Sequence, residues 1–160
     1  MNRTRILSID GGGIKGIVPA VVLLHLEKIL QHLSNNPNSR IHDYFDLFSG
    51  ASTGAIIIAG LLSPDNNNRP KYSSKEILDL YLENGQIIFN SSLFQEIKSV
   101  SGIVNVKYDS EGLESVFEKY FGKSELKDLL KPSLIPVYDL SRGKNYFFRQ
   151  QKALKSPRHN

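Results

Sequence analysis

The chain has 160 residues, of which 40% are hydrophobic and 22% charged, as expected for one globular domain, residues 1–160. It contains no cysteine, which excludes disulfides, thiolate metal sites and a cysteine nucleophile, and fits a reducing, cytoplasmic location. No run of eighteen apolar residues is present, so we expect no spanning helix. Asp10 and the three glycines after it interrupt the stretch that follows the basic start, so we expect no signal peptide. The histidines have no metal-ligand spacing, so no metal and no cofactor is expected; they are His25, His32, His42 and His159.

The formal net charge is +4, and the positive charge gathers near the carboxyl end. The charged residues after Asp139 are all basic: Arg142, Lys144, Arg149, Lys152, Lys155 and Arg158. A basic stretch favours contact with an anionic membrane surface or with nucleic acid, and a solvated tail is the alternative. Because aromatic side chains are not interleaved beyond Phe148, we prefer the solvated tail and expect no nucleic-acid partner, while peripheral contact with an anionic membrane surface stays open.

Apolar runs, caps and turn residues predict the elements in chain order. Strands are expected at 5–10, 44–48, 134–140 and 144–149, and helices at 17–33, from the residues after 52 to 62, at 73–84 and at 110–121. The helix over 17–33 has a wide apolar face, so we expect it to be mostly buried. Ser73 and Glu76 form a predicted capping box, whereas residues 87–106 stay unassigned. Strand-helix-strand-helix order predicts an α/β fold with parallel strands.

A glycine-rich loop follows the first predicted strand, where Gly11, Gly12, Gly13, Lys15 and Gly16 precede the first helix. The spacing fits the dinucleotide fingerprint G-x-G-x-x-G, but the acidic residue needed about twenty residues later is absent. A phosphate-binding P-loop fits less well, because no Lys-Ser or Lys-Thr pair follows. The third interpretation is an oxyanion hole, in which backbone N–H groups point at one developing negative charge. A glycine turn without chemistry is the remaining alternative.

A second motif, Gly50-Ala51-Ser52-Thr53-Gly54, follows the second predicted strand and precedes a helix. In this G-x-S-x-G pattern the serine occupies the apex of a sharp turn, which the flanking glycines permit. The helix directs its positive amino end at the serine, which suits a nucleophile for acyl transfer. A small-residue turn is the alternative. In a parallel sheet the two motifs lie side by side, so the oxyanion-hole interpretation explains both.

The paired motifs, together with the residue preceding the glycine loop, resemble the patatin-like phospholipase family. They read Asp10-Gly11-Gly12-Gly13-Ile14-Lys15-Gly16 and Gly50-Ala51-Ser52-Thr53-Gly54, and Tyr108, residues 113–122, 126–129 and 135–140, Gly143 and Phe147 are also similar. The resemblance implies a three-layer α/β/α fold with a mostly parallel sheet. It also implies a Ser-Asp dyad acting on lipid acyl esters, with Ser52 as nucleophile and oxyanion N–H groups from Gly12 and Gly13. Lys15 occupies a position where that family usually has Arg or Lys.

One departure from the family pattern concerns the catalytic aspartate. The family carries it in Asp-Gly-Gly or Asp-Gly-Ala well after the serine, and no Asp-Gly pair follows Ser52 here. The aspartates that follow the serine are Asp65, Asp79, Asp109, Asp128 and Asp139. We therefore expect the amino-terminal portion of a domain, incomplete at its carboxyl end, with no carboxylate reaching the serine. A sheet without its last strands exposes an edge through which chains associate.

The sequence thus predicts a lipid acyl hydrolase with Ser52 as nucleophile, the glycine loop as oxyanion hole and the aspartate base missing. By itself such a chain should be nearly inactive. The alternative from another class is a non-catalytic remnant that binds lipid or a partner, which the missing aspartate and the basic tail favour. A dinucleotide-binding module is a third hypothesis, which the missing ribose-binding acid disfavours.

Overall fold

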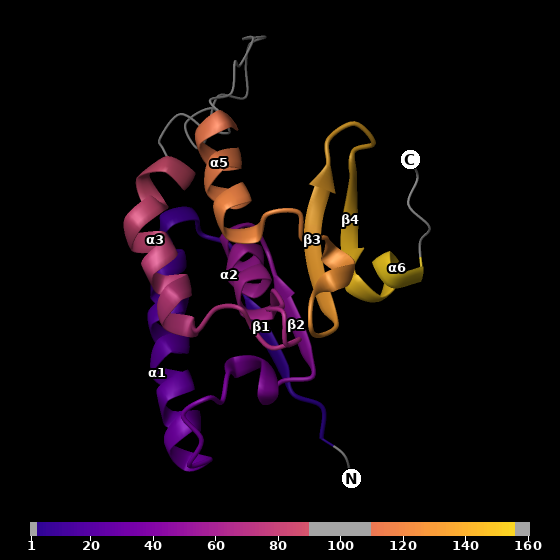
Figure 1. Ribbon diagram of the computed structural model, residues 1–160. Coiled ribbons are helices and arrows are strands. Elements are labelled where there is room, and N and C mark those ends of the chain that lie inside the picture. Colours follow the sequence, from indigo (N-terminus) through magenta and orange to yellow (C-terminus); the bar gives the residue numbers. More distant parts are fainter. Residues whose placement is uncertain (1–2, 90–109, 156–160) are drawn as a thin grey trace.

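The computed structural model describes residues 3–89 and 110–155, and these residues build one four-stranded sheet with helices packed against it (Figure 1). The strands are β1 (Ile6–Ile9), β2 (Leu47–Gly50), β3 (Ser133–Asp139) and β4 (Lys144–Arg149). They lie in the order β1-β2-β3-β4, with the first three parallel and the β3–β4 hairpin antiparallel. The predicted α/β class with a mostly parallel sheet is confirmed.

The described residues also contain five helices and three short 3-10 turns, which connect the strands except for α6, which follows the last strand. The helices are α1 (Ile17–Leu33), α2 (Thr53–Leu62), α3 (Ser74–Ile88), α5 (Ser110–Phe121) and α6 (Gln150–Lys155). The 3-10 turns are η1 (Gly13–Gly16), η2 (Ile41–Asp43) and η4 (Leu126–Asp128). None of the helices in this part of the chain has the length and apolar character needed to cross a bilayer.

Two predicted boundaries were wrong, both by a few residues. The strand predicted over 44–48 begins only at Leu47, because the preceding residues close η2 and Tyr44 donates its backbone N–H to Ile41. Helix α3 continues one turn beyond residue 84 to Ile88, whose side chain is buried in the core. The unassigned stretch 87–106 lies outside the described residues from residue 90 onward.

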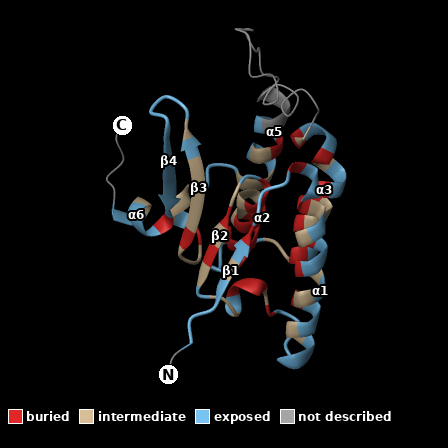
Figure 2. Ribbon diagram, turned by 180° about the vertical axis from the view of Figure 1, so that it is seen from behind, coloured by how far each residue is buried: buried red, intermediate tan, exposed pale blue. Residues whose placement is uncertain are grey.

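The layering follows from the strand order. Because β1, β2 and β3 advance in one direction across the sheet, right-handed crossovers place the intervening helices on the same face. Leu7 and Ile9 of β1 and Phe48 of β2 point toward these helices and join the core, in which α2 is almost entirely buried. The opposite face of β1 carries Ile6, which is 57% exposed. Figure 2 shows most of the buried residues gathered where the helices meet the sheet.

Helix α1 corrects the expectation of a mostly buried helix. Only Ala20, Leu23 and Glu27 are buried, along the narrow stripe that faces α3 and the turns beside it. Val18 is 65% exposed and Leu33 is 76% exposed. The wide apolar face is present as predicted, but within residues 3–89 and 110–155 no element covers its outer half.

A buried carboxylate joins three elements of this helical layer. Glu27 of α1 accepts hydrogen bonds from the Ile41 N–H of η2 at 3.3 Å and from the Ser74 N–H at 3.1 Å. The Ser74 hydroxyl donates to the same carboxylate at 3.0 Å. Because Ser74 begins α3, the negative charge also lies at the positive end of that helix. Glu27 therefore fixes how α1 and α3 pack side by side.

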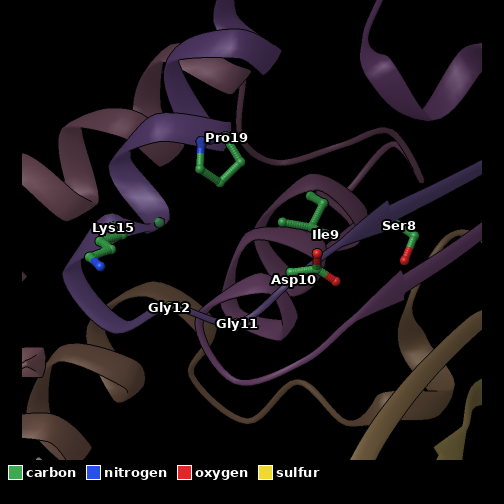
Figure 3. Close-up of a pocket in the computed structure, with 8 residues that line it drawn as sticks. Ser8, Ile9, Asp10, Gly11, Gly12, Lys15 and Pro19 are labelled. Atoms are coloured by element: carbon green, nitrogen blue, oxygen red, sulfur yellow. The ribbon is translucent and has the colours of Figure 1, made fainter.

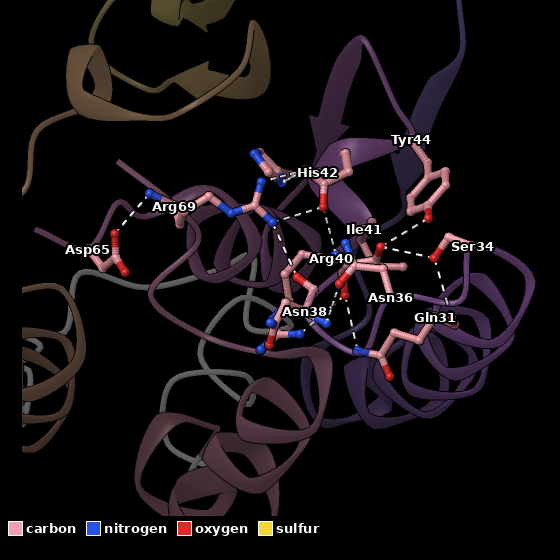
Figure 4. A network of polar contacts seen from close by, with 12 residues as sticks. Gln31, Ser34, Asn36, Asn38, Arg40, Ile41, His42, Tyr44, Asp65 and Arg69 are labelled. Carbon is pink, nitrogen blue, oxygen red and sulfur yellow. Dashed lines mark hydrogen bonds and ion pairs between the residues drawn. The ribbon is translucent and has the colours of Figure 1, made fainter. Parts of the chain in front are cut away.

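Polar contacts close the amino-terminal edge of the sheet, opposite the carboxyl ends of the parallel strands (Figure 4). The Arg69 guanidinium donates to both carboxylate oxygens of Asp43 in η2, at 2.7 and 3.0 Å. Asp65 in turn accepts the backbone N–H of Arg69 at 2.8 Å. This network holds the polar loop after α2 against the turn that enters β2.

We predict that Glu27→Ala lowers the free energy of unfolding by about 3 kcal/mol, because it leaves the buried N–H groups of Ile41 and Ser74 without an acceptor. Urea denaturation followed by circular dichroism measures the change. Glu83→Ala, at an exposed position of α3, is the control and should alter stability by less than about 0.5 kcal/mol. Equal effects of the two substitutions would contradict the role given to Glu27.

Candidate active site

Ser52 stands between the last residue of β2 and the first residue of α2 with an unusual backbone conformation. Its φ is 51° and its ψ is −119°. The other non-glycine residues with positive φ in the described chain are Asn35 and Asn68, and asparagine tolerates such angles well. Holding a serine there costs on the order of 1–3 kcal/mol, which the surrounding packing must offset. The strained turn that the G-x-S-x-G pattern predicts is therefore present in the structure.

The two glycines that flank the serine turn, Gly50 and Gly54, have no space for a side chain. A Cβ atom on Gly50 would overlap the carbonyl group of Gly54, and a Cβ on Gly54 would overlap the carbonyl of Ile9. The Ser52 side chain makes no capping hydrogen bond to α2, and the residue is exposed. The turn thus presents a hydroxyl that the local structure does not use.

The glycine loop lies directly beside the serine turn. A Cβ on Gly11 would stand 3.1 Å from the Ser52 Cβ and 3.1 Å from the Ala51 carbonyl oxygen. Ala51 also donates its N–H to the Ile9 carbonyl at 3.2 Å, which ties the serine turn to the end of β1. The two motifs, about forty residues apart in sequence, therefore meet at the carboxyl ends of β1 and β2.

The loop itself turns sharply into α1. Gly13 has a φ of 58° and is buried, and η1 leads directly into the helix. Gly16 packs so closely against Thr53 and the Tyr81 ring that a Cβ would overlap both. Lys15 is exposed on the same turn. The consecutive glycines at the amino end of a helix match the oxyanion-hole interpretation, and the assignment of N–H groups from Gly12 and Gly13 stays a prediction.

An open cavity of about 320 Å³ lies behind the glycine loop (Figure 3). Its lining comes from the end of β1, the loop and the first turn of α1, and includes Ser8, Asp10, Lys15 and Pro19. Ser52 is not part of this lining. The cavity therefore follows the edge of β1 that faces away from β2 and does not enclose the serine.

Tyr81 of α3 holds the serine turn from inside, a role that sequence reasoning missed. Its ring is 1% exposed, and its hydroxyl donates to the Thr53 carbonyl at 2.8 Å. The Thr53 hydroxyl lies 2.7 Å from the Tyr81 hydroxyl oxygen. Because the Tyr81 hydrogen is already donated to the carbonyl, the Thr53 hydroxyl is the donor of this second bond. Burial raises the pKa of Tyr81 to about 12. In sequence, Tyr81 is one of several apolar positions on the buried face of α3, so nothing there separates it from an ordinary core residue.

Within residues 3–89 and 110–155, no carboxylate is hydrogen-bonded to the Ser52 hydroxyl. The described aspartates that follow Ser52 accept hydrogen bonds from other groups. Asp65 accepts from the backbone of its own loop, and Asp79 accepts from the Lys75 ammonium. Asp128 accepts from the Glu125 N–H, and Asp139 accepts from the backbone of the turn at 141–142. Asp109 lies outside the described residues. The part of the chain that can be described therefore brings Ser52 and a glycine loop together without a carboxylate hydrogen-bonded to the serine, and the absence of a base from this chain stays a prediction.

The three histidines of the described residues lie outside this site, and His159 lies outside the described residues. His25 and His32 are exposed on α1, as predicted, while His42 is buried in η2 at the opposite edge of the sheet. Its Nδ1 lies 3.1 Å from the Asp43 carboxylate, and burial lowers the pKa of His42 despite that charge. The described residues contain no group of three or more potential metal ligands.

At the end of β2, where the dinucleotide fingerprint needs an acid, the structure has the serine turn.

Comparison with known proteins agrees with this geometry. A family model for patatin-like phospholipase matches residues 7–158. Patatin group M-3 from Solanum tuberosum is 39% identical over 152 residues, which cover 95% of this chain and 37% of the relative. Patatin group M-1 and Patatin-B1 from the same species are each 38% identical over the same shares. The chain thus spans 37% of the length of these relatives, and the resemblance drawn from the two motifs is confirmed.

Alanine is ordinarily more stabilising than glycine, and the strained backbone at Ser52 predicts the reverse order for substitutions there. Ser52→Gly should be more stable than Ser52→Ala by about 1 kcal/mol, because glycine adopts positive φ freely and alanine does not. At Ser8, in the extended strand β1, the same pair should show the opposite order. Urea denaturation of the four variants measures both differences. Equal stability of the two Ser52 variants would show that the turn is unstrained.

Tyr81→Phe should lower the free energy of unfolding at pH 8 by about 1–2 kcal/mol, because it removes both hydrogen bonds to Thr53. Tyr138→Phe, at an exposed position, serves as control. Since an unfolded tyrosine ionises near pH 10 and the folded Tyr81 only near 12, the unfolded state loses its proton first. The stabilising effect of Tyr81 should therefore shrink between pH 10 and 12. A difference that is constant across that range would contradict the buried, protonated hydroxyl.

Proposed function

The chain belongs to the patatin-like phospholipase family, and on that premise we propose that it carries the nucleophile and oxyanion loop of a lipid acyl hydrolase. The observation that carries this proposal is the strained, exposed Ser52 at the start of α2, in contact with the glycine loop. Patatin group M-3 and the other relatives are longer proteins, so the activity proposed here is that of a protein extending beyond these 160 residues.

In the proposed reaction a base removes the proton of the Ser52 hydroxyl as its oxygen attacks the carbonyl carbon of a fatty-acyl ester. The resulting tetrahedral oxyanion accepts hydrogen bonds from the backbone N–H groups of Gly12 and Gly13. The amino end of α2 and the Lys15 ammonium add positive potential nearby. The alcohol then leaves with a proton, and water hydrolyses the acyl-serine ester. An aspartate outside the described residues supplies the base.

A non-catalytic protein that binds lipid or a partner is the second candidate. It is favoured by the serine's lack of a carboxylate partner in the described residues, and by the open edge of β1, through which chains associate. A cytoplasmic location, peripheral to membranes, belongs to both proposals and is supported by the cysteine-free composition and the basic carboxyl end.

Turnover of p-nitrophenyl butyrate tests the hydrolase proposal on two proteins. One is the 160-residue chain, and the other is this chain extended by the segment that follows the matched region in Patatin group M-3. We expect hydrolysis by the extended protein and a rate at least about 10³-fold lower for the chain alone, because a serine without its base keeps only oxyanion binding. Ser52→Ala in the extended protein should remove the activity.

Ser124→Ala, at an exposed position outside the site, is the matched control and should retain full activity. An extended protein that stays active with Ser52→Ala would show that another group is the nucleophile. A 160-residue chain as active as the extended protein would show that its own residues include the base.

A further inference from the structure

The β3–β4 hairpin projects beyond the carboxyl ends of β1 and β2, where Ser52 lies (Figure 1). The register pairs Ser49 with Leu134, so the last residue of β2, Gly50, stands level with Ile135. Strand β3 continues to Asp139, four residues further, before β4 returns antiparallel to it. At about 3.3 Å per residue the hairpin extends roughly 13 Å past the end of β2. A flat surface that approached the serine edge would meet the end of this hairpin.

An apolar side chain occupies the end of the hairpin, residues 138–144, which we call the hairpin tip. Leu140 is 88% exposed, more than any other large hydrophobic residue in the described chain, and Tyr138 beside it is 58% exposed. Asp139 closes the turn by accepting hydrogen bonds from the Ser141 N–H, the Ser141 hydroxyl and the Arg142 N–H. The turn therefore holds Leu140 outward in an ordered loop.

Two exposed basic residues follow this leucine in the hairpin tip. The Arg142 side chain is 77% exposed, and Lys144 is exposed as well. Asp139 is the one acid of the hairpin tip, and its carboxylate lies 3.7 Å from Arg142. Basic residues on an edge strand also discourage edge-to-edge aggregation, but that need does not account for an exposed leucine, which promotes aggregation. An apolar residue flanked by cations suits the boundary between anionic headgroups and acyl chains.

We propose that the hairpin tip docks the protein on anionic lipid bilayers. Leu140 enters the acyl-chain boundary, Tyr138 lies at headgroup level, and Arg142 and Lys144 contact lipid phosphates. Because the hairpin tip and Ser52 both lie at the carboxyl ends of the parallel strands, docking turns the serine toward the membrane. Only this last step rests on the proposed hydrolase function, since binding to a bilayer requires no catalysis.

Flotation of the 160-residue chain with phosphatidylcholine vesicles, with and without about 30% phosphatidylserine, tests the docking at about 0.1 M salt. We expect binding to the anionic vesicles that weakens as salt rises. Leu140→Ser, and the double variant Arg142→Ser with Lys144→Ser, should each weaken it about tenfold. The controls remove equivalent groups elsewhere: Leu33→Ser at the far end of α1, and Lys28→Ser with Lys123→Ser. These should change binding by less than about twofold.

Insertion of Leu140 into the bilayer can be measured separately from binding affinity. Because the chain has no cysteine of its own, one introduced cysteine carries the only label. An environment-sensitive fluorophore on Leu140→Cys should shift to shorter wavelength with anionic vesicles, and the same label on Leu33→Cys should not. Absence of vesicle binding, tip variants that bind like the wild type, or an unshifted label on Leu140→Cys would each overturn the docking proposal. A chain that docks but whose extended form lacks esterase activity would overturn only the hydrolase function.

Discussion

The candidate site depends on a direct backbone contact between the start of α2 and the end of β1. Gly54 lies against the Ile9 carbonyl so closely that no side chain fits between them. This contact carries the serine turn to the neighbouring glycine loop, where Gly11 meets Ser52. It also allows Tyr81 to reach the first residue of α2 from the opposite side. A larger residue at Gly54 would therefore separate the two motifs as well as destabilise the core.

The strand order decides which parts of the molecule are covered. Successive right-handed crossovers place the helices between the parallel strands, which are α1, α2, α3 and α5, on one face of β1 and β2. Helix α2 is therefore buried, while Ile6 on the opposite face remains exposed. Among the described residues, the same order leaves β1 without a neighbouring strand on its outer side, where the end of the strand lines the cavity behind the glycine loop. The site thus combines a rigid floor, built by α2 and α3, with an open side along β1.

Much of this could be predicted from local patterns. The bounds of α1, the capping box of Ser73 and Glu76, and the hairpin followed from periodicity, cap residues and turn chemistry, which act over a few residues. The exposed half of α1 could not be predicted, because its apolar pattern does not say whether another element lies beside it. Tyr81 was missed for a related reason, since its partner Thr53 comes from another helix and only the folded chain brings them together.

We propose that the glycine loop binds the oxyanion that forms on Ser52. A crystal structure of the extended protein after reaction with an alkyl fluorophosphonate tests it most directly, because the phosphonyl oxygen occupies the position of that oxyanion. We predict a covalent bond from Ser52 Oγ to phosphorus, with the oxygen about 2.7–3.1 Å from the backbone nitrogens of Gly12 and Gly13. Modification of a different residue would show that Ser52 is not the nucleophile, and a phosphonyl oxygen that points away from the loop would show that the loop is not the oxyanion hole.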